Sequence, residues 1–330
     1  MKIVQFVKPG PPDVLQVVDV PMPQPGAGEI LVKSQWIGVG IPDILIRSGA
    51  YAWMPKLPCT PGTEISGTVE AVGTGVKAFV PGQKVIVSAR ERTERGGCYA
   101  EYVAVEETAA YALPDGIDME GAACLANYQV AWHVLWSAAR ARKGETVLLY
   151  AAAGGVGNAV VDLAKGADLN VIGVVSSEKK AAFAREIGCA HTIDRSREDV
   201  GKRVAEITGG RGVDVIVDPV GGPTFLKHFD MLAPLGIVVH YGHLGGKTEV
   251  DLAGALKKKF GDSPAVRAFS MHTFDHWPEK RRECTLDLIA QLADGRIRPR
   301  VDDRLRLDQA AEAHRRLEAG NVQGKLLLKP

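Results

Sequence analysis

Residues 146–165 read TVLLYAAAGGVGNAVVDLAK, an apolar run that passes through a glycine-rich turn into a second apolar segment. The run TVLLY is typical of a buried strand, and the segment after the glycines is typical of a helix. Ala152, Gly154 and Gly157 occupy the three fixed positions of the pattern GxGxxG, with alanine at the first. Gly154 allows the backbone to approach a pyrophosphate, and Gly157 allows the helix to pack closely on the strand. This stretch therefore predicts a dinucleotide-binding turn with the phosphates at the helix N-terminus.

The same strand–helix alternation continues on both sides of this turn. We expect a helix at 120–139 before it and two helices at 280–294 and 307–319 with a strand at 325–328 after the sheet. The strands of the sheet itself are expected at 146–151, 170–175, 191–194, 213–218, 236–241 and 266–271, and its helices at 155–165, 178–187, 198–208 and 224–232. Continuous apolar strands that alternate with helices predict an α/β fold with a doubly wound parallel sheet of the Rossmann type.

The first 120 residues have a different pattern. Turn signals such as Pro25-Gly26, Pro61-Gly62 and Pro81-Gly82 separate short apolar runs. These runs predict strands near 3–7, 29–35, 67–72, 84–87 and 99–105. The pattern is typical of an irregular β-rich domain. With 330 residues, and roughly 150 residues per domain, we expect about two domains.

Composition excludes several classes of protein. The chain has 40 Lys and Arg against 39 Asp and Glu, a net charge of +1, which argues against a nucleic-acid partner. Its longest weakly polar run, 146–161, is shorter than the roughly 18–20 residues that span a bilayer, and its N-terminus does not resemble a signal peptide. The five cysteines are widely spaced without a CxxC pair, which is typical of free thiols in a reducing compartment. We therefore expect a cytoplasmic protein without a membrane partner.

The end of the second strand indicates which dinucleotide binds. An NAD site usually has an acidic residue there for the ribose hydroxyl, whereas this chain has Ser176. Lys179 and Lys180 follow, and Arg195 comes directly after the third strand. A hydroxyl beside cations suits a 2′-phosphate, so we expect NADPH. Glu178 is the residue that argues against this interpretation, and the cations could alternatively be solvated surface residues.

Motifs along nearly the whole chain resemble the medium-chain dehydrogenase/reductase superfamily. The best match is its zinc-independent quinone oxidoreductase branch, which includes zeta-crystallin. The motifs that carry the resemblance are IGVGIPDILIRSGAY (37–51), PGTEISGTVEAVGTGVKAFVPGQKV (61–85), GGCYAEYVAV (96–105), AAAGGVG (151–157) and VDVIVDPVGG (213–222). The resemblance implies a β-rich GroES-like catalytic domain at 1–121, a Rossmann NADP(H)-binding domain at 122–271 and a return to the catalytic domain at 272–330.

The resemblance also indicates that zinc is absent. Zinc-dependent relatives place Cys where this chain has Gly40 and His where it has Thr63, which leaves Glu64 alone at the catalytic metal position. Their structural zinc needs four close cysteines, and the corresponding segment has only Cys98. The histidine pairs 240/243 and 272/276 lack a third ligand in the sequence. We therefore predict no metal site.

Matching positions in related enzymes imply the roles of individual residues. Tyr51 corresponds to a proton donor, although a packed aromatic side chain is an equal alternative. Further pocket residues on the catalytic side are Gly40, Ile41, Asp43 and Trp53. The residues expected to bind the cofactor are Asn127, Val130, Ala153, Gly154, Gly155, Val156, Gly157, Ser176, Lys180, Arg195, Val220, Tyr241 and His243.

The resemblance implies hydride transfer from NADPH to a quinone. Two alternatives stay open, reduction of an enone or enoyl-thioester double bond and a non-catalytic NADPH-binding protein. A pantetheine substrate would favour a basic channel, for which Arg47, Arg90, Arg92 and Arg95 are candidates. Differences from bacterial quinone oxidoreductases occur at Gly40, Leu45, Arg195 and Gly320. The resemblance also implies a homodimer that pairs edge strands of the cofactor domains, for which the strand 236–241 is a candidate.

Overall fold

The computed structural model describes all 330 residues, which form two compact units. The first unit comprises Met1–Ala126 together with Thr285–Pro330, and the second comprises Asn127–Cys284. The divisions thus fall after residues 126 and 284, whereas the sequence predicted them after 121 and 271. Residues 272–284 belong to the second unit because the Phe274 ring stacks on His133, with 3.7 Å between the ring centroids.

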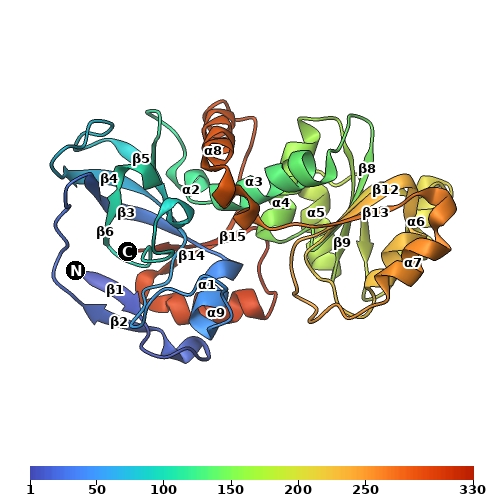
Figure 1. Ribbon diagram of the computed structural model, residues 1–330, viewed down its shortest axis with the longest axis horizontal. Coiled ribbons are helices and arrows are strands. Elements are labelled where there is room, and N and C mark those ends of the chain that lie inside the picture. Colours follow the sequence, from blue (N-terminus) through green and yellow to red (C-terminus); the bar gives the residue numbers. More distant parts are fainter. The chain divides into compact units, whose positions relative to one another are not determined.

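The second unit contains a six-stranded sheet in which every pair of neighbours is parallel. Its strand order, β10-β9-β8-β11-β12-β13, is the 3-2-1-4-5-6 order of a Rossmann fold. The predicted doubly wound parallel sheet is therefore confirmed. Figure 1 shows its helices packed around the sheet. The elements are α3 (Leu125–Trp132), β8 (Thr146–Tyr150), α4 (Gly155–Lys165), β9 (Asn170–Val175), α5 (Glu178–Ile187), β10 (His191–Asp194), α6 (Val200–Thr208), β11 (Val213–Asp218), β12 (Leu232–His240), α7 (Leu252–Lys258) and β13 (Ala265–Ala268).

Three predictions for this part of the chain were wrong. Residues 224–232 do not form an α-helix but a 3₁₀ segment, η5 (Phe225–Asp230), and β12 begins directly after it at Leu232. The strand 236–241, a candidate for edge pairing, belongs to β12, which lies between β11 and β13, so the edge strand on this side of the sheet is β13. The helix predicted at 120–139 is divided into α2 (Met119–Ala122), α3 and the π-helix η4 (His133–Ala139).

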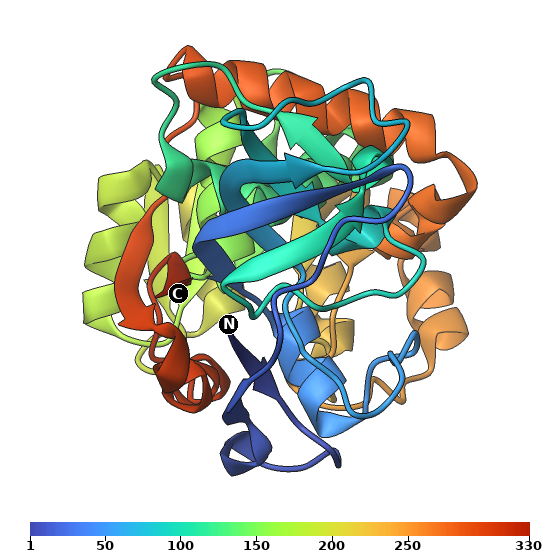
Figure 2. The same cartoon turned by 90° about the vertical axis from the view of Figure 1, so that its left-hand side faces the viewer.

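The first unit is built on a seven-stranded sheet, largely antiparallel, in the order β14-β15-β3-β4-β5-β7, with β6 paired to β3. Figure 2 views this unit from the side where the short hairpin of β1 and β2 lies, and both chain termini belong to it. The pattern predicted six of its strands but not β2, β7, β14 or the helix α1. The elements are β1 (Lys2–Gln5), β2 (Gln16–Asp19), β3 (Glu29–Val39), α1 (Ile41–Ser48), β4 (Glu64–Val72), β5 (Lys84–Ser88), β6 (Tyr102–Glu106), β7 (Ala110–Ala112), α8 (Pro278–Ala293, begun in the second unit), β14 (Val301–Arg306), α9 (Ala310–Glu318) and β15 (Lys325–Lys329).

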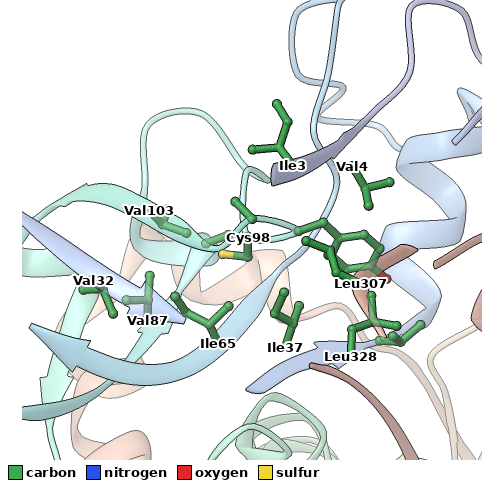
Figure 3. Packing of buried hydrophobic residues seen from close by; sticks show 14 of the residues in the cluster. Ile3, Val4, Val32, Ile37, Ile65, Val87, Cys98, Val103, Leu307 and Leu328 are labelled. Atoms are coloured by element: carbon green, nitrogen blue, oxygen red, sulfur yellow. The ribbon is translucent and has the colours of Figure 1, made fainter. Parts of the chain in front are cut away.

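The core of the first unit joins both parts of the chain that build it. Figure 3 shows side chains from the N-terminal segment, such as Ile37 and Ile65, packed with Leu307 and Leu328 from the C-terminal segment. Burial of these apolar side chains is the main force that returns the C-terminal segment to this unit. In the second unit a separate core forms around Leu148, Ile216 and Val238, which lie on three neighbouring strands.

No helix in the structure is both long enough and apolar enough to cross a lipid bilayer.

Candidate functional site

The glycine-rich turn between β8 and α4 has the geometry of a phosphate loop. A Cβ atom at Gly157 would lie 2.4 Å from the carbonyl oxygen of Ala151 and 2.6 Å from that of Ala152, so no side chain fits there. A Cβ atom at Gly154 would have only the Ala151 oxygen as a neighbour, at 3.3 Å. Gly157 therefore allows the helix to pack on the turn, while Gly154 leaves an open face at the N-terminus of α4. Free N–H groups at such a terminus fit a pyrophosphate.

Alanine at the first position of the pattern has a structural reason. A Cβ atom on Gly173, in the middle of β9, would lie 2.9 Å from the Cβ of Ala152 and 2.8 Å from the Cys189 sulfur. The methyl group of Ala152 thus fills the space over Gly173, and both residues are buried. The sequence pattern alone did not reveal this pairing.

The end of β9 presents a hydroxyl between two cations. The ammonium of Lys180 donates to Oγ of Ser176 at 3.1 Å. The backbone N–H of Arg195 donates to the carbonyl of Val175 at 3.0 Å, which fixes Arg195 beside the same strand end. Burial lowers the pKa of Lys180, and the positive charge of Arg195 lowers it further. Two repelling cations beside a hydroxyl are a favourable site for a dianionic phosphate.

Glu178, the residue that argued against a phosphate here, has another partner. Its carboxylate accepts from the guanidinium of Arg185 at 2.5 Å. The residues of this strand end therefore fit the 2′-phosphate of NADPH.

The predicted residues Asn127 and Val130 lie on α3 on either side of Tyr128. The Tyr128 hydroxyl donates to Asp162 of α4 at 2.8 Å, so α3 is attached to the helix of the phosphate loop. Asn127 and Val130 are both half-buried.

Val220, Tyr241 and His243 lie at the carboxyl ends of β11 and β12. Asp218, which the sequence analysis did not single out, organises this end of the sheet. Its carboxylate accepts from the backbone N–H of Val220 at 2.7 Å and of Gly221 at 3.1 Å, and its carbonyl accepts from the N–H of Tyr241 at 3.0 Å. Ligands of open parallel sheets bind at this edge.

The predicted catalytic residues Gly40 and Asp43 lie in the first unit, at the start of α1. The N–H of Gly40 donates to Oδ2 of Asp43 at 2.8 Å. Asp43 is fully buried, and burial raises its pKa to about 7. The Tyr99 hydroxyl lies 3.4 Å from the same oxygen and 3.0 Å from Nε2 of His314. Asp43 therefore holds Gly40 and the first turn of α1 in place from the interior.

The carboxylate of Glu64 forms an ion pair with a lysine of the same chain. Its Oε1 accepts from the ammonium of Lys325 at 2.5 Å, and its Oε2 accepts from the N–H of Ala126 at 2.9 Å. The ammonium would lie 3.7 Å from a Cβ at Gly40, the position at which zinc-dependent relatives carry a ligand. No cluster of three His, Cys, Asp or Glu side chains in the structure could hold a metal ion.

Tyr51 and Trp53 follow α1 in a loop of the first unit. Their ring centroids are 5.8 Å apart, and the guanidinium of Arg95 lies 5.7 Å from the Trp53 ring. Tyr51 is half-buried and Trp53 is exposed.

Two of the four arginines proposed for a basic channel have structural partners. Arg47 is buried and bound to Glu318. Arg92 donates to the carbonyl of Gly96 at 2.8 Å and lies 3.9 Å from Glu106. Arg47 and Arg92 are therefore no longer candidates for the basic channel, and Arg90 and Arg95 remain.

Comparison with known proteins identifies the family. Residues 26–115 match the model of the alcohol dehydrogenase GroES-like domain, and residues 155–281 match that of the zinc-binding dehydrogenases. The chain is 36% identical to a quinone oxidoreductase of Pseudomonas aeruginosa, over 100% of this chain and 99% of the relative. The chain belongs to the quinone oxidoreductase branch of the medium-chain dehydrogenase/reductase superfamily.

Further similarities agree with this family. The crystal structure of the Escherichia coli quinone oxidoreductase complexed with NADPH superimposes with a TM-score of 0.91 and 32% identity, covering 100% of both chains. The chain is also 33% identical to a zebrafish (Danio rerio) synaptic vesicle membrane protein VAT-1 homolog, over 92% of this chain and 64% of that relative. The region that matches the zinc-binding dehydrogenases begins at residue 155 and therefore does not include the two positions Gly40 and Thr63.

Proposed function

We propose that this chain is an NADPH-dependent oxidoreductase that reduces quinones without a metal ion. The observation that carries the proposal is the arrangement of Ser176, Lys180 and Arg195 at the end of β9, beside a strand whose end lacks an acidic residue. The relatives named quinone oxidoreductase support the acceptor class, and the relative crystallised with NADPH supports the cofactor.

Bound NADPH would supply the hydride, and the chain's residues would bind and orient it. Ala153, Gly154, Gly155, Val156 and Gly157 form the turn and first helical residues that would receive the pyrophosphate. Ser176, Lys180 and Arg195 would receive the 2′-phosphate. Asn127, Val130, Val220, Tyr241 and His243 are proposed to contact the nicotinamide end.

A quinone is already electrophilic, so its reduction requires positioning and a proton source rather than a Lewis acid. We assign Tyr51 as a hydrogen-bond donor to the acceptor's oxygen, Gly40 as the residue that leaves space for the acceptor, and Asp43 as the side chain that holds Gly40. A phenol can donate to an oxygen that gains negative charge.

The variant Tyr51→Phe tests this assignment. We expect kcat for quinone reduction to fall about 100-fold, the lower range for a lost hydrogen-bond donor to an oxygen that gains negative charge, with an unchanged Kd for NADPH. Tyr102→Phe, on β6 of the same unit, is the matched control. Unchanged turnover in Tyr51→Phe would remove Tyr51 from the site.

The function itself is tested with chelator-treated protein, by following NADPH oxidation with an ortho-quinone and with an enoyl thioester in parallel. Turnover with the quinone alone supports the proposal. Turnover with the thioester alone would establish a double-bond reductase instead. NADPH binding without turnover on either acceptor would favour a non-catalytic protein.

We further propose that the chain forms a homodimer in the cytoplasm. The edge strand of the parallel sheet, β13, offers unpaired backbone groups to a second copy. All five cysteines are free and buried, as is usual in a reducing compartment. Light scattering that yields the mass of one chain would contradict the dimer.

A further inference from the structure

The carboxyl ends of β11 and β12 hold an aspartate between two histidines. Asp218 and His240 are paired residues in the register of these two parallel strands, and His228 lies in η5. Oδ2 of Asp218 lies 3.1 Å from Nε2 of His228 and 3.4 Å from Nδ1 of His240. The Asp218 side chain is only 1% exposed, so these contacts are shielded from solvent.

Asp218 is ionised in this environment. Burial alone would raise its pKa, but the hydrogen bonds from His228 and His240, together with the N–H group of Val220, outweigh burial and lower the pKa. An ionised carboxylate can only accept hydrogen bonds. The Nδ1 atom of His240 therefore carries a hydrogen toward Asp218, whose backbone oxygen also lies 3.2 Å from it.

This arrangement leaves Nε2 of His240 as the nitrogen that can gain and lose a proton. Nε2 is buried and has no hydrogen-bond partner within the protein. The hydrogen bond to Asp218 raises the pKa of His240 above its ordinary value, so the imidazolium persists to higher pH. An imidazole oriented through Nδ1 by a buried carboxylate is a recurrent arrangement for proton transfer.

The groups around His240 favour its charged form. Asp218 on β11 is the anion in contact with it, and His228 on η5 shares that carboxylate. Tyr150 on β8 lies behind His228, with 4.9 Å between the ring centroids, and burial raises the pKa of its phenol. In the following loop, Lys247 lies 4.0 Å from Glu249, which balances its charge.

His243 connects this buried group to the surface. Its ring stands edge-on to that of His240, with 5.1 Å between the centroids, and its side chain is exposed. The two rings share no hydrogen bond, because Nε2 of His240 has no partner within the protein, so a proton would pass between them through one water molecule.

We propose that the Asp218–His240 pair stores a proton and passes it through His243 to the reduced acceptor. The proposal rests on the quinone reductase function proposed above. A quinone that has gained a hydride, with its two electrons, carries one negative charge and needs one proton to become a hydroquinone. The N–H bond of His243 breaks as the O–H bond of the hydroquinone forms, His240 returns a proton to His243 through the bridging water, and a proton from solvent reaches His240 by the same route.

In this scheme His243 donates the proton, and His240 acts through it. A purely structural role for His240 is the competing explanation, because the ring also packs against the loop of Val220–Gly222. A Cβ atom at Gly221 would lie 2.7 Å from Cε1 of His240. The relay requires Nε2 of His240 to bind and release a proton. The structural explanation requires only the packing of the ring and the contact of Nδ1 with Asp218.

The variant His240→Asn separates them. The amide of asparagine can donate to Asp218 in place of Nδ1, but it has no titrating nitrogen in place of Nε2. For the wild type we expect kcat to decline as pH rises through the pKa of His240. In His240→Asn we expect this decline to be lost, kcat for quinone reduction to be about 100-fold lower, and the Kd for NADPH to be unchanged. His243→Asn should also lower kcat and remove this pH dependence, and it should weaken NADPH binding as well, because His243 is proposed to contact the nicotinamide. His191→Asn, which changes an exposed histidine on β10, serves as the control.

A second measurement does not depend on turnover. In histidine-labelled protein, NMR titration should place the pKa of His240 above about 6.5, the ordinary histidine value. Turnover by His240→Asn with the rate and pH profile of the wild type would overturn the relay and leave the reductase function intact. A His240 ring that titrates at or below the ordinary value would also overturn it. Wild-type protein that reduces no quinone would contradict the proposed function, while the NMR titration would still report on the Asp218–His240 pair.

Discussion

The two units of the molecule differ in where their charged and polar side chains lie. In the first unit, Asp43, Glu64 and Lys325 lie inside the unit with no more than 5% of their surface exposed. In the second unit, the middle of the parallel sheet is apolar, and the polar groups that matter lie at the carboxyl ends of its strands. A parallel sheet covered on both faces leaves room for polar side chains only at its ends.

Charged side chains therefore contribute to different properties in the two units, namely to stability in the first and to ligand binding in the second. In the first unit Glu64 depends on Lys325, a partner from a distant part of the chain, whereas Asp43 accepts a hydrogen bond from the nearby N–H of Gly40. In the second unit Lys180 at the end of β9 remains available to a ligand, whereas Asp218 at the end of β11 is buried with Nε2 of His228 at 3.1 Å. We therefore expect substitutions of charged residues to reduce stability in the first unit and ligand binding in the second.

The largest effect is expected for Lys325→Met. This change leaves the buried carboxylate of Glu64 without its cation, which should lower the free energy of unfolding by about 3–5 kcal/mol. The double variant Lys325→Met with Glu64→Gln should recover much of the loss. Lys143→Met, which breaks an exposed pair with Asp168, is the control and should leave the free energy of unfolding unchanged. Urea denaturation measures all three, and a stable Lys325→Met protein would contradict the dependence on pairing.

Gly157→Ala should give the next largest effect. The new Cβ meets backbone oxygens at 2.4 and 2.6 Å, so the turn must shift, with an expected cost of about 1–3 kcal/mol. The matched variant Gly154→Ala has a free face and should fold normally but bind NADPH more weakly. Thermal melting and fluorescence titration with NADPH separate the two effects. Equal stability of both variants would show that the close approach at Gly157 is not needed.

The raised pKa of Asp43 predicts that this residue's contribution to the stability of the first unit depends on pH. Its folded pKa, about 7, lies above the roughly 4 of an unfolded aspartate, so folding takes up a proton between these values. The contribution of Asp43 is therefore most favourable below about pH 4 and declines as pH rises to about 7, by at most ~1.4 kcal/mol per pH unit. Asp43→Asn should remove this part of the slope in denaturation curves from pH 4 to 8. An identical slope in both proteins would contradict the prediction.

Lys180→Met should have the smallest effect on the fold and act on binding instead. Loss of one charged partner of the 2′-phosphate should weaken NADPH binding about 10-fold, with little change for NADH. Lys202→Met, an exposed lysine on α6, is the control. An equal loss of affinity for both cofactors would place Lys180 outside the 2′-phosphate site.

The sequence predicted the second unit well because its signals are local. Apolar strands, a glycine turn and amphipathic helices follow one another within a few residues, and the Rossmann order agrees with them. The prediction failed at residues 224–232, where η5 is followed by the start of β12. Apolar residues in that segment fit a helix and a strand equally well, and only the pairing of β12 with β11 and β13 decides between them.

By itself, the sequence determined the family resemblance, the phosphate loop and the hydroxyl with its cations at the end of β9, because each depends on neighbouring residues. The tertiary structure alone decided that Lys325 neutralises Glu64 and that Asp218 meets His240. These contacts join residues from different strands or helices, and their energies depend on burial and on distances that no local pattern encodes. Folding brings such groups together because a buried charge is stable only with a partner.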